Sequence, residues 1–473
     1  MDIKQTFPFQ IFRAYDIRGK LNVLTPERIV TIAHGLAQQY LAAGHTKLVL
    51  GYDARLTGPY YAALVQAVLG EHGLCVTNIG CCSTPLMYFT ARSHDGNGIM
   101  ITASHNPKTD NGIKWVMGNQ PPSPEIIQQV GWYASQIRVD LSPYLHLQST
   151  VVHQENAYFD RYEDALVQDI QLNHRFKIVL DGLHGSAGEG TRRLLERLGC
   201  EVIAIRCEPN GHFPDHAPDP SQALHLETLR QYVLAEQADL GIALDGDGDR
   251  LVVVDEHATI ISADRLISLF SQLCLAAQPA HEVVFDVKCS TMVRNTILAC
   301  GGQPTMIRTG STFLRQYLAK SAGRAIFGGE YAGHYVFNDG RGYGFDDGPY
   351  AALRLLEYMA AHPTQSLSSL LAAYPERCST EDLYINTYEA NPVHVLQDIE
   401  AQGQTFQALL SRTDGIRLDF HDGFGILRAS NTGEYFTARF DAETPQRLAE
   451  IKQIFVTMLQ KKYPKLAHDL SQA

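Results

Sequence analysis

The sequence predicts an α/β fold: three similar mixed α/β domains with parallel crossovers and a smaller C-terminal α+β domain, arranged around a central cleft. Three observations support this prediction. A strand–helix–strand pattern occurs three times along the 473 residues, each copy is followed by a further apolar strand that ends in a polar loop, and the C-terminal part repeats neither feature. At roughly 100–200 residues per domain, this length accommodates several domains. We expect the domains to span residues 1–148, 149–258, 259–372 and 373–473.

Each copy of the repeated unit is predicted to form a strand, a helix that ends at a glycine, and a second strand. The short β-branched runs, the helical periodicity and the glycine at the helix end each support this assignment. A strand–helix–strand crossover implies parallel strands in a layered α/β domain. The predicted elements are strand 47–53, helix 60–69 and strand 74–79; strand 176–181, helix 190–198 and strand 200–205; and strand 282–286, helix 291–299 and strand 304–307.

The further apolar strands lie at 98–104, 239–245 and 324–330. Open parallel sheets bind ligands beyond the carboxyl ends of their strands, so these strands aim three polar loops outward from equivalent positions. The loops meet in one cleft if the domains face one another. The C-terminal domain is predicted to contain strands 382–387, 416–420, 425–429 and 436–440 and a helix at 445–460.

Composition narrows the classes of function. Lys plus Arg number 39 and Asp plus Glu number 51, so the formal net charge is −12. A nucleic-acid binder needs a basic face, and we therefore expect no nucleic-acid partner. No apolar run is long enough to span a membrane, and the N-terminal residues lack a signal-peptide pattern, so we expect no membrane partner. The nine cysteines show neither a disulfide framework nor zinc spacing, which favours a cytoplasmic location.

Three carboxylates, Asp245, Asp247 and Asp249, alternate with glycine directly after a predicted strand. Their oxygens form a hard-cation site that suits Mg²⁺ when a phosphate supplies a further ligand. A solvated acidic turn is the alternative. A calcium EF-hand loop is excluded, because its sixth position requires glycine and holds Arg250, and because the flanks read as strands.

A buried strand also delivers Ser104 into a polar turn, Thr102-Ala-Ser-His-Asn-Pro107, in which His105 follows the serine and Lys114 comes ten residues later. A serine is a poor nucleophile unless it is activated or already carries a phosphate. Taken alone, the segment also fits a structural Asn-Pro turn with an incidental hydroxyl.

Two further polar turns are candidate binding loops. Glu330 and His334 bracket a glycine-rich turn and could grip vicinal sugar hydroxyls, although an ordinary glycine-rich turn fits equally. The segment that begins at Arg428 has the composition of a phosphate cradle without metal, although an ordinary polar turn is the commoner reading of it alone.

Some other polar residues have less specific settings. Arg18 and Lys288 follow strands in this interpretation, and either could instead be a solvated surface charge. His212, His216 and Asp219 lie along a proline-rich loop, and a solvated role is expected for them rather than a metal site.

In combination these motifs are far more specific. The sequence resembles the α-D-phosphohexomutase superfamily, whose four-domain members carry T-A-S-H-N-P, D-G-D-G-D-R, G-E-x-S-G-H and R-x-S-N-T in this order. The resemblance runs from Tyr15-Asp-Ile-Arg-Gly to the Arg428 segment. It is strongest to the bacterial phosphomannomutase/phosphoglucomutase branch.

The resemblance implies a role for each matching residue. Ser104 would be the phosphoserine, one Mg²⁺ per chain would be held by the three aspartates and the Ser104 phosphate, and His105 and Lys114 would serve proton transfer and charge stabilisation. The remaining implied roles concern the substrate. Arg18, Arg250 and Lys288 would steady phosphate and sugar, Tyr15 would contact the substrate, Glu330 and His334 would read the sugar O3 and O4, and Arg428, Ser430, Asn431 and Thr432 would bind the phosphate that is not reacting.

The implied activity is an isomerase that interconverts hexose 1-phosphate and hexose 6-phosphate of mannose and/or glucose. It would use a hexose 1,6-bisphosphate as intermediate and activator, on a monomer or weak dimer. Two substitutions depart from the family near the sugar: Ala332 stands where serine is usual and Ser311 where histidine is common. They bear on sugar preference more than on the reaction class.

Three alternatives stay open at this point. A phosphoglucosamine mutase shares nearly every motif, but its reactive loop more often begins Ser-Ala-Ser where this chain has Thr102-Ala-Ser. A metal-dependent sugar phosphatase would not need two phosphate sites. A catalytically silent sugar-phosphate binder would not need an intact serine, aspartate trio and Lys114.

Overall fold

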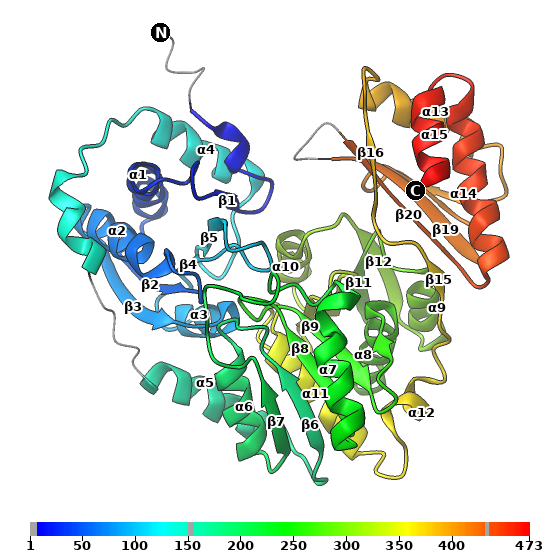
Figure 1. The fold of residues 1–473 in the computed structure, drawn as a ribbon, viewed down its shortest axis with the longest axis horizontal. Helices are drawn as coiled ribbons and strands as arrows, with labels where there is room; N and C mark the ends of the chain where they lie inside the picture. The colour runs from blue at the N-terminus through cyan, green and yellow to red at the C-terminus, as the bar shows by residue number, and fades with distance from the viewer. Residues whose placement is uncertain (1–6, 150–155, 431–434) are drawn as a thin grey trace. The chain divides into compact units, whose positions relative to one another are not determined.

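The computed structural model describes residues 7–149, 156–430 and 435–473 (Figure 1). The chain forms two compact units. The first contains the residues up to Ile261 together with Ala332–Leu370, and the second contains Ser262–Tyr331 together with Leu371–Ala473.

The first sheet of the first unit has the strand order β1-β5-β4-β2-β3. Strand β2 runs parallel to β3 and β4, whereas β5 is antiparallel to β4 and β1. The strands are β1 (Ile17–Lys20), β2 (Lys47–Tyr52), β3 (Cys75–Cys81), β4 (Gly98–Ile101) and β5 (Asp110–Val116). The helices around them are η2 (Phe9–Ile11), α1 (Pro26–Ala42), α2 (Gly58–Glu71), α3 (Thr84–Ala91), α4 (Pro124–Ser135) and η3 (Ser142–Ser149).

The second sheet repeats this topology in the order β10-β9-β8-β6-β7, with β6 parallel to β7 and β8 and β9 antiparallel to β8. Its strands are β6 (Lys177–Asp181), β7 (Glu201–Ile205), β8 (Leu240–Leu244), β9 (Leu251–Asp255) and β10 (Ile260–Ile261). Its helices are α5 (Asn156–Asp169), α6 (Gly188–Arg197), η4 (Ala223–Leu226) and α7 (Glu227–Glu236). Strand β14 (Tyr335–Phe337) and helix α11 (Gly348–Ala360) complete the first unit, and α12 (Leu367–Leu371) leads out of it.

The second unit contains a parallel sheet and an antiparallel one. In the parallel sheet β11 (Glu282–Asp286) lies between β12 (Gln303–Ile307) and β13 (Ala325–Gly329), with helices α8 (Ala263–Ala277), α9 (Thr291–Ala299) and α10 (Ser311–Lys320). The antiparallel sheet contains β15 (Cys378–Ser379), β16 (Leu383–Asn386), β17 (Leu409–Ser411), β18 (Ile416–Asp419), β19 (Gly423–Ala429) and β20 (Tyr435–Ala442). Helices α13 (Pro392–Gly403), α14 (Pro445–Gln460) and α15 (Pro464–Gln472) accompany it.

The central strands β2, β6, β8 and β11 are buried along nearly their whole length because helices cover both faces of their sheets, whereas the edge strands β3, β7 and β12 are partly exposed. In β2, Leu48 and Leu50 belong to the core that also contains residues of α1, α2 and α4, which Figure 1 shows on one face of the first sheet. Val49 and Gly51 alternate with them and point to the other face, where α3 packs against β2 and β4. This burial makes each strand a rigid support for the loop that follows it.

The predicted fold class is confirmed. Three α/β segments share a strand–helix–strand crossover, and the C-terminal part is a sheet-rich α+β segment. The third strands β4, β8 and β13 end at Ile101, Leu244 and Gly329, so the polar residues that follow them lie in loops, as expected. One local expectation is wrong. Arg18 does not follow a strand but lies within β1, an edge strand in which it pairs with Gly112. The domain boundaries and the central cleft stay predictions.

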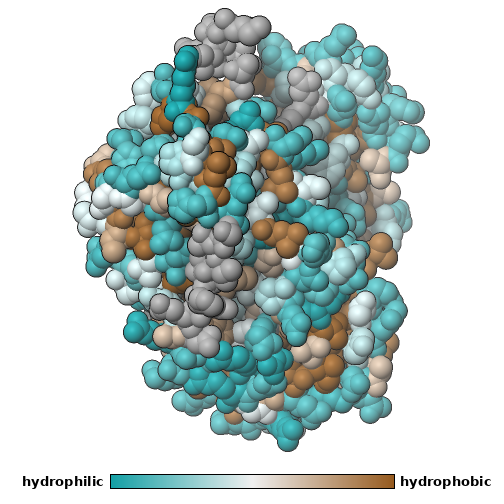
Figure 2. Space-filling model, turned by 60° about the vertical axis from the view of Figure 1, so that its left-hand side comes forward, coloured by the Kyte–Doolittle hydropathy of each residue, from teal (hydrophilic) through white to brown (hydrophobic). Residues whose placement is uncertain are grey.

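The surface is mainly polar on the face that Figure 2 shows, where hydrophobic residues form small separate patches. Within the described ranges, no helix combines the length and the apolar character that a membrane crossing requires.

A buried tyrosine–carboxyl pair links α5 to α11 in the first unit. The Tyr162 hydroxyl donates to the Asp347 carboxyl, at 2.9 Å from Oδ1 and 2.8 Å from Oδ2, and the Tyr350 backbone N–H donates to Oδ1 at 2.9 Å. Burial raises the pKa of Asp347 to about 7, and these hydrogen bonds offset the rise only in part. The carboxyl therefore takes up a proton on folding in mildly acidic solution.

We expect Asp347→Asn to remove a pH dependence of stability. With the pKa raised above its ordinary 3.8, the wild type holds this stabilisation fully below about pH 4 and loses it as pH rises through about 7. The asparagine cannot titrate and keeps an acceptor for Tyr162. Relative to wild type, its free energy of unfolding should rise by about 2–3 kcal/mol between pH 5 and pH 8 in urea titrations. A difference between the two proteins that stays constant with pH would contradict this assignment.

Candidate active site

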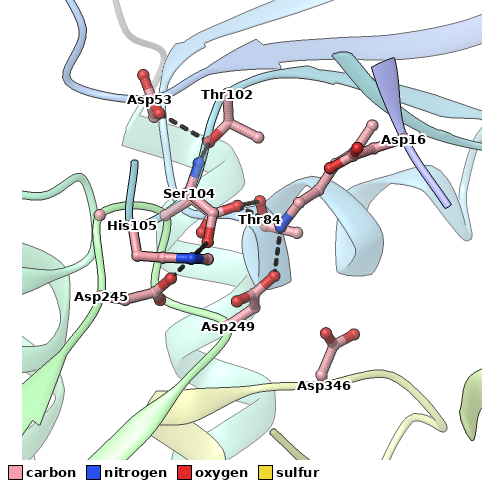
Figure 3. Close-up of polar contacts among 12 residues, drawn as sticks. Asp16, Asp53, Thr84, Thr102, Ser104, His105, Asp245, Asp249 and Asp346 are labelled. Carbon is pink, nitrogen blue, oxygen red and sulfur yellow. Dashed lines mark hydrogen bonds and ion pairs between the residues drawn. The ribbon is translucent and has the colours of Figure 1, made fainter. Parts of the chain in front are cut away.

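Ser104 lies three residues beyond β4 and is buried, with 1% of its surface exposed. Its Oγ donates to Asp245 Oδ2 at 2.7 Å and lies 3.2 Å from His105 Nδ1 (Figure 3). The backbone φ angle of Ser104 is 51°, in the left-handed region that residues with a Cβ rarely occupy. The hydroxyl of Ser104 is therefore not incidental to the fold, because it points into a buried acidic cluster.

The aspartate loop follows β8 and approaches the serine loop closely. A Cβ on Gly246 would lie 2.5 Å from the Ser104 carbonyl oxygen, so only glycine fits there. Gly248 has a φ of +75° and turns the chain back toward β9. The two glycines explain why the three carboxylates alternate with glycine: the loop must curl tightly against another backbone.

All three aspartates are buried, and two of them bind one lysine. Lys114 Nζ on β5 donates to Asp247 Oδ2 at 2.8 Å and to Asp249 Oδ2 at 2.6 Å. The Thr84 hydroxyl at the start of α3 also donates to Asp247 Oδ2, at 2.6 Å. Arg250 Nε lies 4.0 Å from Asp245 Oδ2, so Lys114 and Arg250 set two positive charges against three carboxylates, and the three carboxylates are not fully neutralised by these two side chains.

The donor set fits a hard divalent cation. One carboxylate oxygen from each of Asp245, Asp247 and Asp249 lies within 4.8 Å of the others. Among the residues that the structure describes, Asp247 Oδ1 and Asp249 Oδ1 are buried and accept no hydrogen bond. Buried carboxylate oxygens without a donor are costly, and a cation bound between them would relieve that cost. The solvated acidic turn is thereby excluded.

Burial and neighbouring charges shift the pKa values of Asp245, Lys114 and His105 in different directions. Burial and the charges of Asp249 and Asp247 raise the pKa of Asp245 well above its ordinary value. Burial acts to lower the pKa of Lys114, but Asp247 and Asp249 outweigh it and raise that pKa well above normal. Burial and the charges of Arg250, Arg18 and Lys114 hold the pKa of His105 well below its usual range. At neutral pH the site thus offers a protonated lysine and a neutral imidazole.

Two arginines flank the serine and aspartate loops, Arg18, which is buried, and Arg250, which is partly buried. Arg18 pairs with Asp16, Nη2 to Oδ2 at 2.5 Å, and donates from Nη1 to Asn106 Oδ1 at 2.9 Å. Its 5% exposure shows that the solvated alternative is wrong for Arg18. The Arg250 backbone N–H donates to Asp245 Oδ1 at 3.2 Å. Tyr15, three residues before Arg18, is 37% exposed.

His334 lies beside the aspartate loop. Arg250 Nε donates to His334 Nε2 at 3.0 Å, while His334 Nδ1 lies 2.9 Å from Asp346 Oδ2 and 3.6 Å from Asp249 Oδ1. Burial acts to lower the pKa of His334, but Asp249 and the hydrogen bond to Asp346 raise it above normal. The imidazole is therefore placed next to the candidate metal ligands as well as in the predicted sugar loop.

The other expected substrate residues belong to the second unit. Lys288 forms an ion pair with Asp382, and Glu330 Oε1 accepts the Gly310 N–H at 2.5 Å. Arg428 Nη2 pairs with Asp414 Oδ2 at 2.8 Å, and this oxygen also accepts the Thr309 N–H at 3.2 Å. The structure thus brings Glu330 and Arg428 to the same turn, residues 309–310. The Ser430 N–H donates to the Tyr435 carbonyl at 2.9 Å, and Asn431 and Thr432 lie outside the described residues.

Several polar partners in the site were not anticipated from the sequence: Asp16, Asp53, Arg55, Thr84, Asp346, Asp382 and Asp414. A usable signal existed only for Asp53 and Arg55, a carboxylate and a guanidinium two positions apart at the end of a buried strand.

In the proline-rich loop His212 is exposed, as expected. His216 is not simply solvated: it accepts from Arg206 Nη1 at 2.7 Å and its ring stacks on His225.

Comparison with known proteins identifies the family. Models of phosphoglucomutase/phosphomannomutase alpha/beta/alpha domains I, II and III match residues 9–135, 156–258 and 262–378. A phosphomannomutase/phosphoglucomutase of Pseudomonas putida is 36% identical over 466 residues, covering 98% of each chain. A phosphoglucomutase of Neisseria gonorrhoeae is 35% identical over 456 residues, covering 95% of this chain and 96% of the relative.

The fold agrees with these sequence matches. The crystal structure of a phosphoglucomutase/phosphomannomutase family protein from Burkholderia thailandensis superposes with a TM-score of 0.86 at 31% identity, covering 98% of this chain and 99% of that one. Family models and relatives span the serine, aspartate and glycine-rich loops described above. The chain therefore belongs to the phosphoglucomutase/phosphomannomutase family of hexose phosphate mutases.

Proposed function

We propose that this enzyme moves a phosphoryl group between O1 and O6 of mannose and/or glucose phosphate through phosphorylated Ser104. The observation that carries the proposal is the 2.7 Å contact of Ser104 Oγ with Asp245 in a buried aspartate trio that also binds Lys114. Phosphoryl transfer needs in-line positioning and charge neutralisation, and this arrangement supplies a positioned oxygen, a cation and a candidate metal site. The names of the relatives support mannose and glucose as the sugars.

Asp245, Asp247 and Asp249 would hold one Mg²⁺ together with the phosphate on Ser104. When bound, the ion would neutralise charge on the phosphoryl oxygens in transfer. Lys114 binds two of the carboxylates that would ligate the ion, so its ammonium would lie near the phosphoryl group and stabilise the same charge.

Protons and phosphoryl groups balance over two transfers. In the first, a sugar hydroxyl attacks phosphorus and the bond from phosphorus to Ser104 Oγ breaks. Neutral His105 would accept the hydroxyl proton and pass it to Ser104 Oγ, which lies 3.2 Å from its Nδ1. The product is a hexose 1,6-bisphosphate, which turns over in the site. In the second, Ser104 Oγ gives its proton to His105 and attacks the other phosphate, the bond from that phosphorus to the sugar oxygen breaks, and the sugar oxygen takes up the proton. A free hexose 1,6-bisphosphate would act as activator because it phosphorylates any Ser104 that has lost its phosphate.

The substrate has two ends, so the proposal requires a second phosphate site. Arg428, Ser430, Asn431 and Thr432 would hold the phosphate that is not reacting, and Lys288, Glu330 and His334 would contact the sugar. Arg428 and Lys288 now pair with Asp414 and Asp382, carboxylates that a substrate phosphate would displace.

The free state of all nine cysteines supports a cytoplasmic enzyme.

Replacement of Ser104 tests the reaction class. In Ser104→Ala, conversion of glucose 1-phosphate or mannose 1-phosphate to the 6-phosphate should fall at least about 1,000-fold, because no oxygen remains to carry the phosphoryl group. Phosphorus NMR with Mg²⁺ and a trace of glucose 1,6-bisphosphate measures both sugars. Ser271→Ala, which removes another buried serine hydroxyl, on α8, is the matched control and should retain activity.

Other products in this assay would indicate another function. Release of inorganic phosphate in place of the 6-phosphate would indicate a sugar phosphatase. Conversion of glucosamine 6-phosphate alone would indicate a phosphoglucosamine mutase. An active Ser104→Ala protein would exclude the phosphoserine mechanism.

Metal removal tests the aspartate trio independently of turnover. We expect Mg²⁺ at 100 times its Kd to raise the free energy of unfolding of the wild type by about 2.7 kcal/mol. Asp249→Asn should lose most of this response, because it removes a charge and a candidate ligand. Thermal unfolding with EDTA and with Mg²⁺ measures the effect. An equal Mg²⁺ response in wild type and Asp249→Asn would rule out the trio as the metal site.

The variant Ala332→Ser tests whether the predicted sugar loop contributes to affinity for the hexose phosphate. Restoring the family hydroxyl in Ala332→Ser should lower KM for the hexose phosphate by up to about tenfold with kcat little changed, since one added hydrogen bond contributes about 0.5–1.5 kcal/mol. Steady-state kinetics on glucose 1-phosphate and mannose 1-phosphate measure the change. A KM that is unaltered for both sugars would show that this position does not contact the substrate.

A further inference from the structure

The strained backbone of Ser104 raises the question of what holds it. A residue with a Cβ at a φ of 51° persists only where its surroundings determine the conformation. The loop that carries it, residues 102–110, has no regular secondary structure until β5 begins at Asp110. Something outside the loop must therefore keep the serine oxygen in place.

The side chain that does so is Arg55, which follows β2 and has only 2% of its surface exposed. Nη2 donates to the carbonyl oxygens of Ser104 at 2.8 Å and Asn106 at 2.6 Å. Nη1 donates to those of Pro107 at 2.7 Å and Asp110 at 3.0 Å. A single guanidinium thus binds four carbonyl groups along the reactive loop.

Asp53 completes the arrangement from the other side of Ser104. Its Oδ2 accepts from Arg55 Nε at 3.0 Å and from the Thr102 hydroxyl at 2.7 Å. Thr102 Oγ1 in turn accepts the Ser104 N–H at 2.8 Å, as Figure 3 shows. The backbone carbonyl of Ser104 is therefore bound by Arg55, and its backbone N–H is bound through Thr102 by Asp53.

The Arg55–Asp53 pair is held in place by packing from the loop that contains Gly211 and Phe213. The ring of Phe213 lies under the guanidinium, with its centroid 5.4 Å from Arg55 Cζ. A Cβ on Gly211 would lie 2.3 Å from the Ala54 carbonyl oxygen, so the loop that carries Phe213 packs directly on the backbone beside Arg55. All five N–H groups of Arg55 donate to Asp53 or to the four carbonyl groups of the loop. No N–H group is left to bind a substrate.

We propose that Arg55, with Asp53 and Thr102, is a positioning residue that holds the Ser104 loop in the geometry required for phosphoryl transfer. This inference rests on the proposed role of Ser104. Arg55 touches backbone of the loop and makes no contact with the aspartate trio in the described structure, so it acts through Ser104 and not on the substrate. Its loss should lower kcat and leave KM nearly unchanged, because the substrate contacts come from other loops.

Arg55→Lys is the direct test. Lysine keeps the charge, but three donors on one nitrogen cannot span four carbonyl groups and Asp53. We expect kcat to fall about 100-fold, the loss that a displacement of about 1 Å from the reactive geometry causes, with KM within about threefold of wild type. The phosphorus NMR signal of the phosphoserine should broaden or shift, and kcat is referred to the folded fraction measured by circular dichroism.

Arg354→Lys is the matched control. Arg354 is an equally buried arginine, paired with Asp339 at 2.7 Å and lying over the Phe337 ring, away from the serine loop. It should lose thermal stability but keep kcat per folded molecule within about twofold. A kcat for Arg55→Lys within threefold of wild type, or an equal loss of kcat in Arg354→Lys, would overturn the proposal.

Thr102 provides a second test if Arg55→Lys does not fold. Thr102→Val removes the hydroxyl with little change of shape and should lower kcat up to about tenfold, whereas Thr102→Ser should keep wild-type kcat. Equal kcat in the valine and serine variants would refute the relay to the Ser104 N–H. Wild-type protein that takes up no phosphate on Ser104 from glucose 1,6-bisphosphate, or an active Ser104→Ala variant, would instead refute the proposed function itself.

Discussion

Confinement of three carboxylates in a buried loop is the constraint on which the site depends. Asp245, Asp247 and Asp249 would repel one another strongly without counter-charges, since burial removes the screening that water supplies. Hydrogen bonds donated from three different parts of the first α/β segment partly offset this charge. The donors are Lys114, Thr84 and Ser104. The charge excess that remains makes the site receptive to a cation and, through it, to phosphate.

Parallel-sheet architecture explains how distant segments supply these groups. Strands β4 and β8 occupy equivalent places in sheets of the same topology, and each ends where a ligand-binding loop is expected. Glycine at position 246 lets the two loops approach within backbone contact. Repetition of one supersecondary unit thus places a serine and an acidic trio against each other without any long insertion.

Rigidity of the reactive loop is the second requirement. Phosphoryl transfer is limited by orientation, so a serine on an irregular loop needs external support. The Arg55–Asp53 pair supplies it by binding both backbone groups of Ser104, and the chain following β7 braces the pair through Phe213. Catalytic geometry in the first segment therefore depends on packing from the second, which links stability of the fold to activity.

Local pattern alone determined much of this protein. The period and length of apolar runs defined the strands, and the spacing of aspartate and glycine after β8 indicated a metal loop, because these features depend on neighbours within a few residues. The order of the motifs indicated the family. Tertiary structure decided the rest: that Arg18 is buried within β1, that His334 lies beside Asp249 and Asp346, and that Arg55 binds the Ser104 loop. The contact of Lys114 with Asp247 likewise joins residues 133 positions apart along the chain. No periodicity in the sequence indicates which distant partner a buried charge will meet.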